Sequence, residues 1–363
     1  MSAAAIEAAT AVVIEAPVTR YEPFAFTGTG AEYFRIWIVN LILSVATLGI
    51  YSAWAKVRRL EYFYRHTRVS GASFDYHGKP LAILKGRIVS FLLLGGYYVA
   101  GYFSPAFGVG VAIVVAALLP WLLVRSMRFR LYNSSYRGLR FHFHGTSRES
   151  YRVFLALPLL TAASGFTLMP LLHHQLKRFQ YSNASYGQTR FTFDARISAF
   201  YKVYLLMVLG AIMLLLVIVV LLMLLVGLGL ISGNTGTEPL SQQVVLIGGT
   251  IIMYALGMAV FWSLMTVQIR NLVWRHTALG PHRFISTLEV HRLFAIVVTN
   301  VLGVVFTLGL FRPYAEIRLA RYVIGELSLV SSGRLDEFAA AAQPETPALG
   351  EEAAELLDVD FGI

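Results

Sequence analysis

Two long apolar stretches of this chain contain no lysine or arginine, and this gap in positive charge limits the possible folds more than any other feature. They run from Ile88 to Val124 and from Val203 to Gln268. Each is long enough for two crossings, because a helix needs about 20 apolar residues to span the hydrocarbon core of a bilayer. Basic residues crowd just outside both stretches, as the positive-inside rule expects of cytoplasmic loops. We therefore predict two transmembrane helical hairpins.

The composition also indicates a membrane protein. Of the 363 residues, 57% are hydrophobic and 14% are charged, whereas about a quarter of the residues in a soluble domain are charged. The net charge is +10, and the lysines and arginines that produce it lie beside apolar segments. In such positions basic side chains meet lipid headgroups. We expect membrane lipids as partners and no nucleic acid. The chain has no cysteine, which excludes disulfides and thiolate metal sites.

Seven apolar segments alternate along the chain in the order single, pair, single, pair, single. They cover residues 36–51, 88–104, 106–124, 153–172, 203–231, 244–266 and 293–311. We predict an all-α polytopic membrane protein with four to seven hydrophobic helices in a membrane domain of residues 21–334. Residues 1–20 are predicted to be a flexible N-terminus. Residues 335–363 contain many acidic residues and no basic one, which predicts a disordered acidic tail.

The first and last single segments match each other in sequence. When Asn40 is aligned with Asn300, Thr47-Leu48-Gly49 falls on Thr307-Leu308-Gly309. A constant offset over many positions predicts internal repeats. The middle segment, aligned through Thr167-Leu168, fits less well. The same offset also pairs Tyr51 with Phe311, Trp54-Ala55 with Tyr314-Ala315, Arg58 with Arg318 and Tyr62 with Tyr322.

A second recurring element follows the apolar segments. Aromatic residues alternate with other residues and end near a glycine, which is a strand signal with one aromatic face and one polar face. We therefore expect short cytoplasmic strands or hairpins between the helices. The examples are Phe24-Ala25-Phe26-Thr27-Gly28, Phe74-Asp75-Tyr76-His77-Gly78, Phe141-His142-Phe143-His144-Gly145 and Phe191-Thr192-Phe193-Asp194.

The number of crossings has two interpretations. If all seven segments cross, the basic stretches 175–202 and 269–292 lie outside the cell, against the positive-inside rule. If the three single segments are re-entrant or lie along the interface, every basic loop is cytoplasmic. Irregular backbone at membrane depth is tolerated where protein or water covers it. The sequence leaves both interpretations open.

The run from Phe24 to Gly86 carries a family resemblance. Its marked elements are Phe26-Thr27-Gly28, Thr47-Leu48-Gly49-Ile50-Tyr51, Trp54-Ala55-Lys56-Val57-Arg58 and Lys85-Gly86-Arg87. With these elements the chain resembles the YjgN-like bacterial inner-membrane proteins, a family named for its unknown function. The resemblance covers most of the chain, and it implies a multi-pass protein of the bacterial inner membrane. It implies no catalytic residues.

The search for enzyme motifs gives a negative result. The chain has no G-x-S-x-G, H-E-x-x-H or phosphate-loop motif, and we expect no enzyme, no metal and no cofactor. His142 with His144, and His173 with His174, are fragments of metal sites at most, because further ligands are missing. No carboxylate lies inside the seven segments, which argues against a proton-driven antiporter.

Two groups of polar residues remain as candidates. A buried amide in hydrocarbon needs a hydrogen-bond partner, so Asn40 and Asn300 mark either a functional polar site or contacts between helices. The candidate polar core is Asn40, Thr47, Gly49, Asn300, Thr307 and Gly309. The second group provides candidate contacts to an anion or a lipid headgroup, with anchoring at the interface as the alternative role. It comprises Trp54, Lys56, Arg58, Arg59 and Arg318.

These observations support two hypotheses of function. The first is an integral inner-membrane protein that transports or binds a small anionic or amphipathic molecule. The second is a non-transporting scaffold or lipid-interacting protein whose strands and acidic tail engage partners. The sequence specifies neither the ligand, the driving ion nor the oligomeric state.

Overall fold

The computed structural model describes residues 19–227 and 240–332. Residues 1–18 of the predicted flexible N-terminus lie outside this part of the chain, as does the whole predicted acidic tail, residues 335–363. Residues 228–239 also lie outside it.

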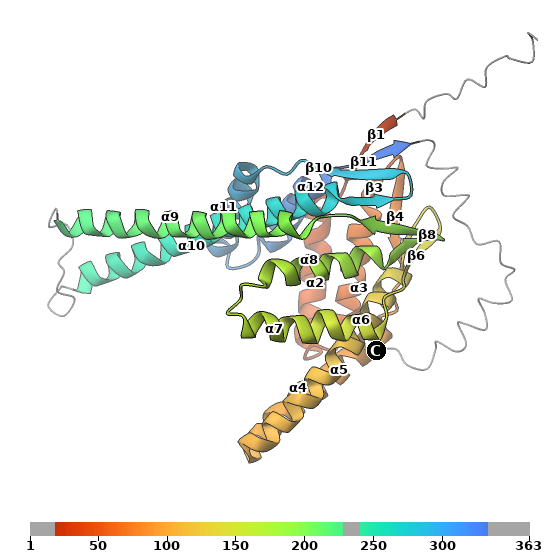
Figure 1. Cartoon of the computed structure of the whole chain (residues 1–363), viewed down its shortest axis with the longest axis horizontal. Coiled ribbons are helices and arrows are strands. Elements are labelled where there is room, and N and C mark those ends of the chain that lie inside the picture. Colours follow the sequence, from red (N-terminus) through yellow and green to blue (C-terminus); the bar gives the residue numbers. More distant parts are fainter. Residues whose placement is uncertain (1–18, 228–239, 333–363) are drawn as a thin grey trace, which may run out of the picture.

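Helical hairpins extend from one end of a β-sheet, and they are all on the same side of it (Figure 1). In the described residues there are five of them, alternately short and long. The two long hairpins are α4 (Pro80–Phe103) with α5 (Pro105–Tyr132), and α9 (Ile197–Gly227) with α10 (Leu240–Arg275). The first and last short hairpins are α2 (Gly30–Ala46) with α3 (Ser52–Arg65), and α11 (Val290–Phe306) with α12 (Arg312–Gly325). In the middle short hairpin the outgoing helix is made of α6 (Ser147–Tyr151), η1 (Arg152–Ala156) and α7 (Leu157–Ala163), and the return helix is α8 (Met169–Ser182).

The sheet overturns the prediction of an all-α protein. Eleven antiparallel strands of the described chain form one sheet in the order β1-β11-β10-β9-β8-β7-β6-β5-β4-β3-β2. Their bounds are β1 (Thr19–Pro23), β2 (Ala25–Phe26), β3 (Thr67–Val69), β4 (Ala72–Tyr76), β5 (Ser134–Tyr136), β6 (Leu139–Phe143), β7 (Ala184–Tyr186), β8 (Thr189–Phe193), β9 (Thr277–Leu279), β10 (His282–Ser286) and β11 (Leu327–Ser332).

One extended run joins the two edges of this sheet. β1 pairs with β11 and β2 pairs with β3. Between them, the backbone N–H of Phe24 donates to the carbonyl of Leu327 at 2.9 Å. Because β1 and β2 follow each other directly, residues 19–26 close the sheet into a ring. Closure leaves no long edge with unpaired backbone groups.

The error in the predicted fold class has a physical cause. Each aromatic strand signal from the sequence lies in or beside a strand, but its partners include three-residue strands such as β5, too short to show a period of two. The ladders between successive hairpins join residues far apart in sequence, such as Phe74 with Tyr136. Such pairing depends on where the intervening helices place the strands, and a local pattern does not specify it.

The long hairpins differ from the short ones in length and composition. Four described helices are long and apolar enough to cross a membrane, at Pro80–Phe103, Pro105–Tyr132, Ile197–Val220 and Ile251–Arg275. Their shortest, α4, has 24 residues, or about 36 Å at 1.5 Å per residue. The short return helices α3, α8 and α12 each have 14 residues, or about 21 Å. Both ends of every short hairpin meet the one sheet, so each single segment turns back towards the sheet from which it extends.

The first and last hairpins lie side by side and complete the circle of helices. The Tyr33 hydroxyl on α2 donates to Glu316 on α12 at 2.9 Å, and Arg59 on α3 forms an ion pair with the same carboxylate at 3.1 Å. Burial, then the negative charge of Glu316, raises the pKa of Tyr33. The guanidinium of Arg321 also donates to the carbonyl of Gly28 at 2.9 Å. These contacts fix α12 beside the strand run that closes the ring.

Candidate ligand site inside the strand ring

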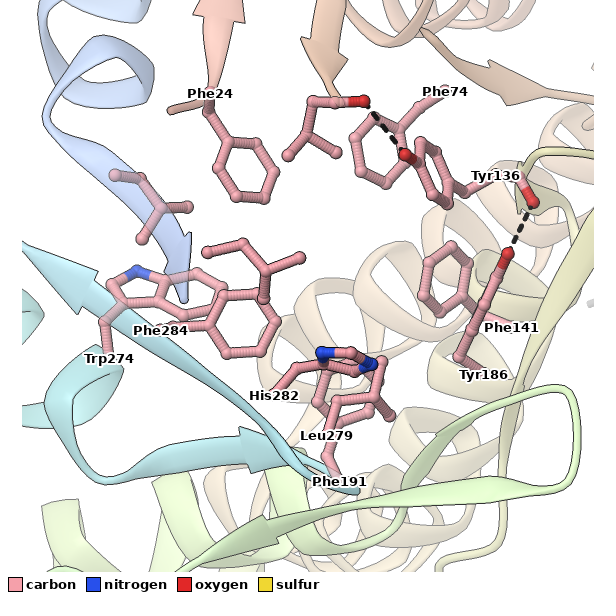
Figure 2. Close-up of a pocket in the computed structure, with 13 residues that line it drawn as sticks. Phe24, Phe74, Tyr136, Phe141, Tyr186, Phe191, Trp274, Leu279, His282 and Phe284 are labelled. Atoms are coloured by element: carbon pink, nitrogen blue, oxygen red, sulfur yellow. Dashed lines mark hydrogen bonds between the residues drawn. The ribbon is translucent and has the colours of Figure 1, made fainter. Parts of the chain in front are cut away.

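Five phenylalanines form a closed circle inside the strand ring (Figure 2). They come from the run that closes the ring and from β4, β6, β8 and β10. Neighbouring ring centroids are 6.2 to 6.5 Å apart all the way round, and four of the five pairs are stacked. The members, in order, are Phe24, Phe74, Phe141, Phe191 and Phe284.

The circle surrounds a cavity of about 230 Å³ with an apolar wall. Val69, Leu279, Leu327 and Leu329 complete the aliphatic part of the lining. An engineered apolar cavity of about 150 Å³ stays dry and binds benzene, so this space is large enough for an aromatic or alkyl group. Figure 2 shows the labelled side chains arranged around the open centre.

Two tyrosines of the lining direct their polar ends to the backbone. The Tyr136 hydroxyl donates to the carbonyl of Val69 at 2.9 Å, and the Tyr186 hydroxyl donates to the carbonyl of Tyr136 at 3.0 Å. Burial raises the pKa of Tyr186 to about 12. These hydroxyl groups are therefore occupied, and their rings contribute apolar surface to the cavity.

Basic side chains lie on the helical side of this cavity. Trp274 lines the cavity and packs on Phe284 at 5.2 Å between ring centroids. Arg270 is one helical turn earlier on α10, and residues four apart share a helix face. Tyr181 on α8 contacts Trp274 at 5.6 Å, and Lys177 is one turn earlier on that helix. Arg270 and Lys177 thus approach the same space from two hairpins.

Lys56 on α3 and Arg130 on α5 extend this basic group. Burial lowers the pKa of Lys56, and the positive charges of Arg87 and Arg130 lower it further. The pKa of Lys177 is lowered by burial and then by Arg270. Burial raises the pKa of the Tyr181 phenol, and the positive charges of Arg270 and Arg130 both lower it. Tyr181 therefore lies near a member of each pair.

These four residues, Lys56, Arg130, Lys177 and Arg270, are the basic cluster. In the described part of the chain no carboxylate forms an ion pair with any of them. Lys56, Arg130 and Arg270 are exposed and Lys177 is partly buried, and like charges that lie near one another attract an anion from solution.

Two of the predicted polar residues are buried at the same position of equal helices. Asn40 in α2 and Asn300 in α11 are 7% and 9% exposed, and both helices have 17 residues. Asn300 donates to the carbonyl of Ala315 at 3.1 Å and accepts from Arg318 at 3.0 Å. The Oδ1 atom of Asn40 is buried without a hydrogen-bond partner. The Asn300 amide thus bonds to its own return helix, α12, and no described hydrogen bond joins it to Asn40.

The predicted threonines and glycines form the tips of the two hairpins. The Thr47 hydroxyl donates to the carbonyl of Leu43 at 2.7 Å and accepts from the N–H of Tyr51 at 2.9 Å. Thr307 makes the same pair of bonds at 2.7 and 2.8 Å. Gly49 and Gly309 have φ of 91° and 95°, a conformation that suits glycine. These four residues reverse the chain. In the middle hairpin the left-handed residues are Gly165 and Phe166, just before the aligned Thr167-Leu168.

The remaining predicted contacts lie around the first hairpin. Trp54 stacks on Tyr51 at 6.1 Å, and the guanidinium of Arg58 lies 5.7 Å from the centre of the same Tyr51 ring. Arg59 is engaged with Glu316, as described above. Of the eleven predicted site residues, the structure brings only Lys56 into the basic cluster.

The histidine pairs are separated by their local contacts. His144 is 2.9 Å from the Ser185 hydroxyl. His173 lies 3.0 Å from the Tyr204 hydroxyl, and His174 lies 2.8 Å from the carbonyl of Ala195. Within residues 19–227 and 240–332, no three His, Asp or Glu side chains are grouped as a metal would require.

The sequence reasoning found most of the cavity wall without identifying a cavity. Four of the five phenylalanines begin the strand signals, and only Phe284 was missed. Its strand continues Ile285-Ser286, so the second aromatic of the pattern is absent. A search for one aromatic residue after each helical hairpin would have found Phe284 together with Phe74, Phe141 and Phe191. Lys177 and Arg270 were considered only as members of the basic stretches 175–202 and 269–292, and Arg130 was not singled out.

Comparison with known proteins gives a family and several relatives. The family described as "Bacterial protein of unknown function (DUF898)" matches residues 21–356. "Inner membrane protein YjgN" of Salmonella typhimurium is 27% identical over 149 residues, which are 41% of this chain and 38% of that protein. The protein of the same name from Escherichia coli K12 is 32% identical over 145 residues, 38% of this chain and 35% of that protein. The match therefore spans under two fifths of either relative. No solved structure matches the chain.

Proposed function

The chain belongs to the DUF898 family of bacterial proteins of unknown function, and from that premise we propose that it is an inner-membrane protein that binds an amphipathic anion in its strand ring. The relatives named above are inner membrane proteins. The four long apolar helices fit two hairpins that cross the bilayer. The strand ring then lies in the cytoplasm, because the basic residues that flank the long hairpins adjoin it.

The depth of the short hairpins supports the same placement. A bilayer with its headgroups is about 40–45 Å thick, so a return helix of 14 residues, about 21 Å long, reaches across one leaflet. The tips carry exposed apolar side chains. Leu48 and Leu308 are both 95% exposed and Phe166 is 68% exposed. We place these three tips among lipid chains.

The single observation that carries the proposed binding activity is that the basic cluster begins one helical turn from the aromatic pair Trp274 and Tyr181 at the edge of the apolar cavity. An apolar group fits the phenylalanine circle, because the lining is aromatic and aliphatic apart from His282. A carboxylate or phosphate attached to it reaches Arg270 and Lys177, one helical turn beyond the aromatic lining. Arginine and lysine bind such groups through charge-assisted hydrogen bonds. A molecule with both parts satisfies the apolar wall and the unpaired cations together.

A fluorescent fatty acid tests this proposal. Titration of cis-parinaric acid into the purified full-length protein in detergent is expected to give saturable binding. Val69→Phe fills part of the cavity, and Arg270→Gln with Lys177→Gln removes two cations. Each change is expected to weaken binding about tenfold or more. Val69→Phe takes up space that the apolar group would occupy, and in the double variant the loss of one charge-assisted contact costs about 1.5–3 kcal/mol. Arg148→Gln, on the exposed face of α6, serves as the matched control.

Two outcomes would contradict the proposal. One is binding that does not saturate. The other is unchanged affinity in the Val69→Phe protein, provided that it elutes in gel filtration like the unmodified protein. The corresponding fatty alcohol separates the two halves of the site, because it is expected to respond to Val69→Phe and not to the charge substitutions. The alternative prediction of a scaffold depends partly on the acidic tail, which lies outside the described residues.

A further inference from the structure

A separate groove of about 470 Å³ runs along the first hairpin, between α2 and α3. It is more open to solvent than the cavity in the strand ring, and no residue lines both. Its apolar side is formed by Ile36 and Val39 from α2. The other lining residues are Arg35, Arg58, Glu61, Tyr62, Arg65 and His66.

The charged groups of this groove are of both signs and are largely unpaired. Arg35 and Glu61 form no ion pair within the described residues. Glu61 is three residues after Arg58 and four before Arg65 on α3, spacings that permit a bond on one helix face. Arg65 instead pairs with Asp75 on β4 at 3.4 Å. The groove therefore presents two cations, Arg35 and Arg58, and one free carboxylate.

The matched arginine of the last hairpin shows why Arg58 is available. Arg318 donates to the buried amide of Asn300 at 3.0 Å. Arg58 has no corresponding bond, since the Oδ1 atom of Asn40 has no partner. Its guanidinium lies over the Tyr51 ring and lines the groove. A cation held by an aromatic face keeps its N–H donors free for a ligand.

The depth of the groove matches the level of lipid headgroups. The Leu48 tip of this hairpin is 95% exposed and apolar. Arg58 and Arg65 are six and thirteen residues after the first residue of α3, Ser52, or about 9 and 20 Å along the helix axis. With the tip inside one leaflet, the groove occupies the outer half of that leaflet and the headgroup layer, which together end about 20–22 Å from the bilayer centre.

We propose that this groove binds the headgroup of a phospholipid that carries a primary amine. The lipid phosphate pairs with Arg35 and Arg58, and the ammonium group pairs with Glu61. Ile36 and Val39 lie beside the first part of the acyl chains. A purely anionic lipid would leave Glu61 facing negative charge, and a quaternary amine would offer Glu61 no N–H donor. The charge pattern therefore selects a zwitterionic lipid of the ethanolamine type.

Lipid retention tests this proposal. The full-length protein is reconstituted in vesicles containing equal parts of phosphatidylethanolamine, phosphatidylcholine and phosphatidylglycerol, extracted in mild detergent, and analysed by mass spectrometry for bound lipid. We expect phosphatidylethanolamine to be enriched at least threefold over either other lipid. Arg35→Gln with Arg58→Gln is expected to remove the bound lipid, while Arg148→Gln leaves it unchanged.

The carboxylate variant gives the sharper result, because misfolding cannot reproduce it. Glu61→Gln is expected to retain bound phospholipid but to lose the preference for ethanolamine over glycerol headgroups. Unchanged enrichment in Glu61→Gln, or a preference of the unmodified protein for phosphatidylglycerol, would overturn the proposal. So would displacement of the lipid by millimolar glycerophosphoethanolamine, which would indicate a site for the soluble headgroup. The groove variants should bind cis-parinaric acid normally, so this test and the test of the strand ring fail independently.

Discussion

The first and last helical hairpins are built alike and satisfy their buried amides differently. In both, a 17-residue helix carries a buried asparagine at the same position, a Thr-Leu-Gly turn reverses the chain, and a 14-residue helix returns to the sheet. In the last hairpin Arg318 bonds the amide of Asn300. In the first, Arg58 lies over Tyr51 and the Oδ1 atom of Asn40 has no partner.

The two hairpins also differ at one helix position near the turn. Gly303 of α11 lies against the ring of Phe311, and a Cβ atom there would overlap that ring. The matched residue of α2 is Leu43. Both turn aromatics stack on the aromatic residue three positions later, Tyr51 on Trp54 and Phe311 on Tyr314, and in the first hairpin the guanidinium of Arg58 lies over the Tyr51 ring. We expect the leucine to hold the Tyr51 ring where Arg58 can lie over it, which an exchange of the two residues tests.

Matched sequence positions in these two hairpins therefore need not share a role. The last hairpin uses its Asn–Arg pair to hold two helices together, which is the interhelical role. The first hairpin leaves both groups of that pair without their internal bond and has an open basic groove beside them. A hairpin with a free arginine is better suited to bind a ligand than one whose arginine is engaged.

Replacement of the two asparagines by leucine is expected to produce the largest contrast. Asn300→Leu removes one hydrogen bond from a charged donor and one to a buried carbonyl, at a cost of about 3 kcal/mol in the free energy of unfolding. Asn40→Leu removes an oxygen that has no partner, and it is expected to change stability by less than about 1 kcal/mol. Thermal unfolding in detergent measures both. Equal losses of unfolding free energy in the two variants would show that the two amides contribute equally to stability.

Exchange of the matched glycine and leucine is expected to have the next largest effect. Gly303→Leu forces the Phe311 ring from its place and costs about 2 kcal/mol, as overpacking does. Leu43→Gly opens the matching space for Tyr51 in the first hairpin. In that variant Arg58 is expected to turn towards Asn40, and retention of phosphatidylethanolamine is expected to fall. Normal lipid retention in Leu43→Gly would show that this position does not control Arg58.

The turn glycines provide a test in which the two hairpins should agree. Gly49→Ala and Gly309→Ala each place a Cβ atom in open space, so the cost arises only from the left-handed backbone. That cost is about 1 kcal/mol at each site. Denaturant or thermal unfolding of the two proteins should give equal losses. A loss at one site alone would mean that the turns are not equivalent.

Replacement of Arg58, the matched arginine of the first hairpin, is expected to have the smallest effect on stability. Arg58→Gln breaks an exposed cation–π contact with Tyr51, worth about 0.5 kcal/mol. A similarly small change in the unfolding temperature is expected, although lipid retention should decrease. Arg318→Gln is the matched control, because it should lower stability more and leave the bound lipid in place. The reverse pattern would assign the lipid site to the last hairpin.

Much of the helical architecture could be predicted from the sequence. The predicted segments 88–104 and 106–124 correspond to α4 and α5, because hydrophobicity and the absence of charge are local properties. The break at Thr47-Leu48-Gly49 was also visible, since glycine marks a backbone that must turn. The repeat that relates the hairpins remains a prediction, as does the cytoplasmic side of the basic loops.

The candidate site could be predicted only in part. Phe74 and Phe141 were recognisable as strand residues, but their stacking at 6.4 Å depends on ladders between separate hairpins. Lys56, Lys177 and Arg270 are far apart in sequence, and nothing local shows that they approach one space. The sequence also suggested that Asn40 and Asn300 form one polar core. Asn300 bonds within its own hairpin, and the shared core remains a prediction.

By itself, the sequence determined which segments are apolar, where the chain turns and where positive charge collects, because each depends on neighbouring residues alone. Only the tertiary structure decided that the strands close into a ring, that five phenylalanines enclose a cavity, and that Arg318 is bonded while Arg58 is free. Ring closure requires residues 19–26 to pair with strands at both ends of the described chain. Such non-local pairing follows from the combined placement of all five hairpins, and no short pattern encodes it.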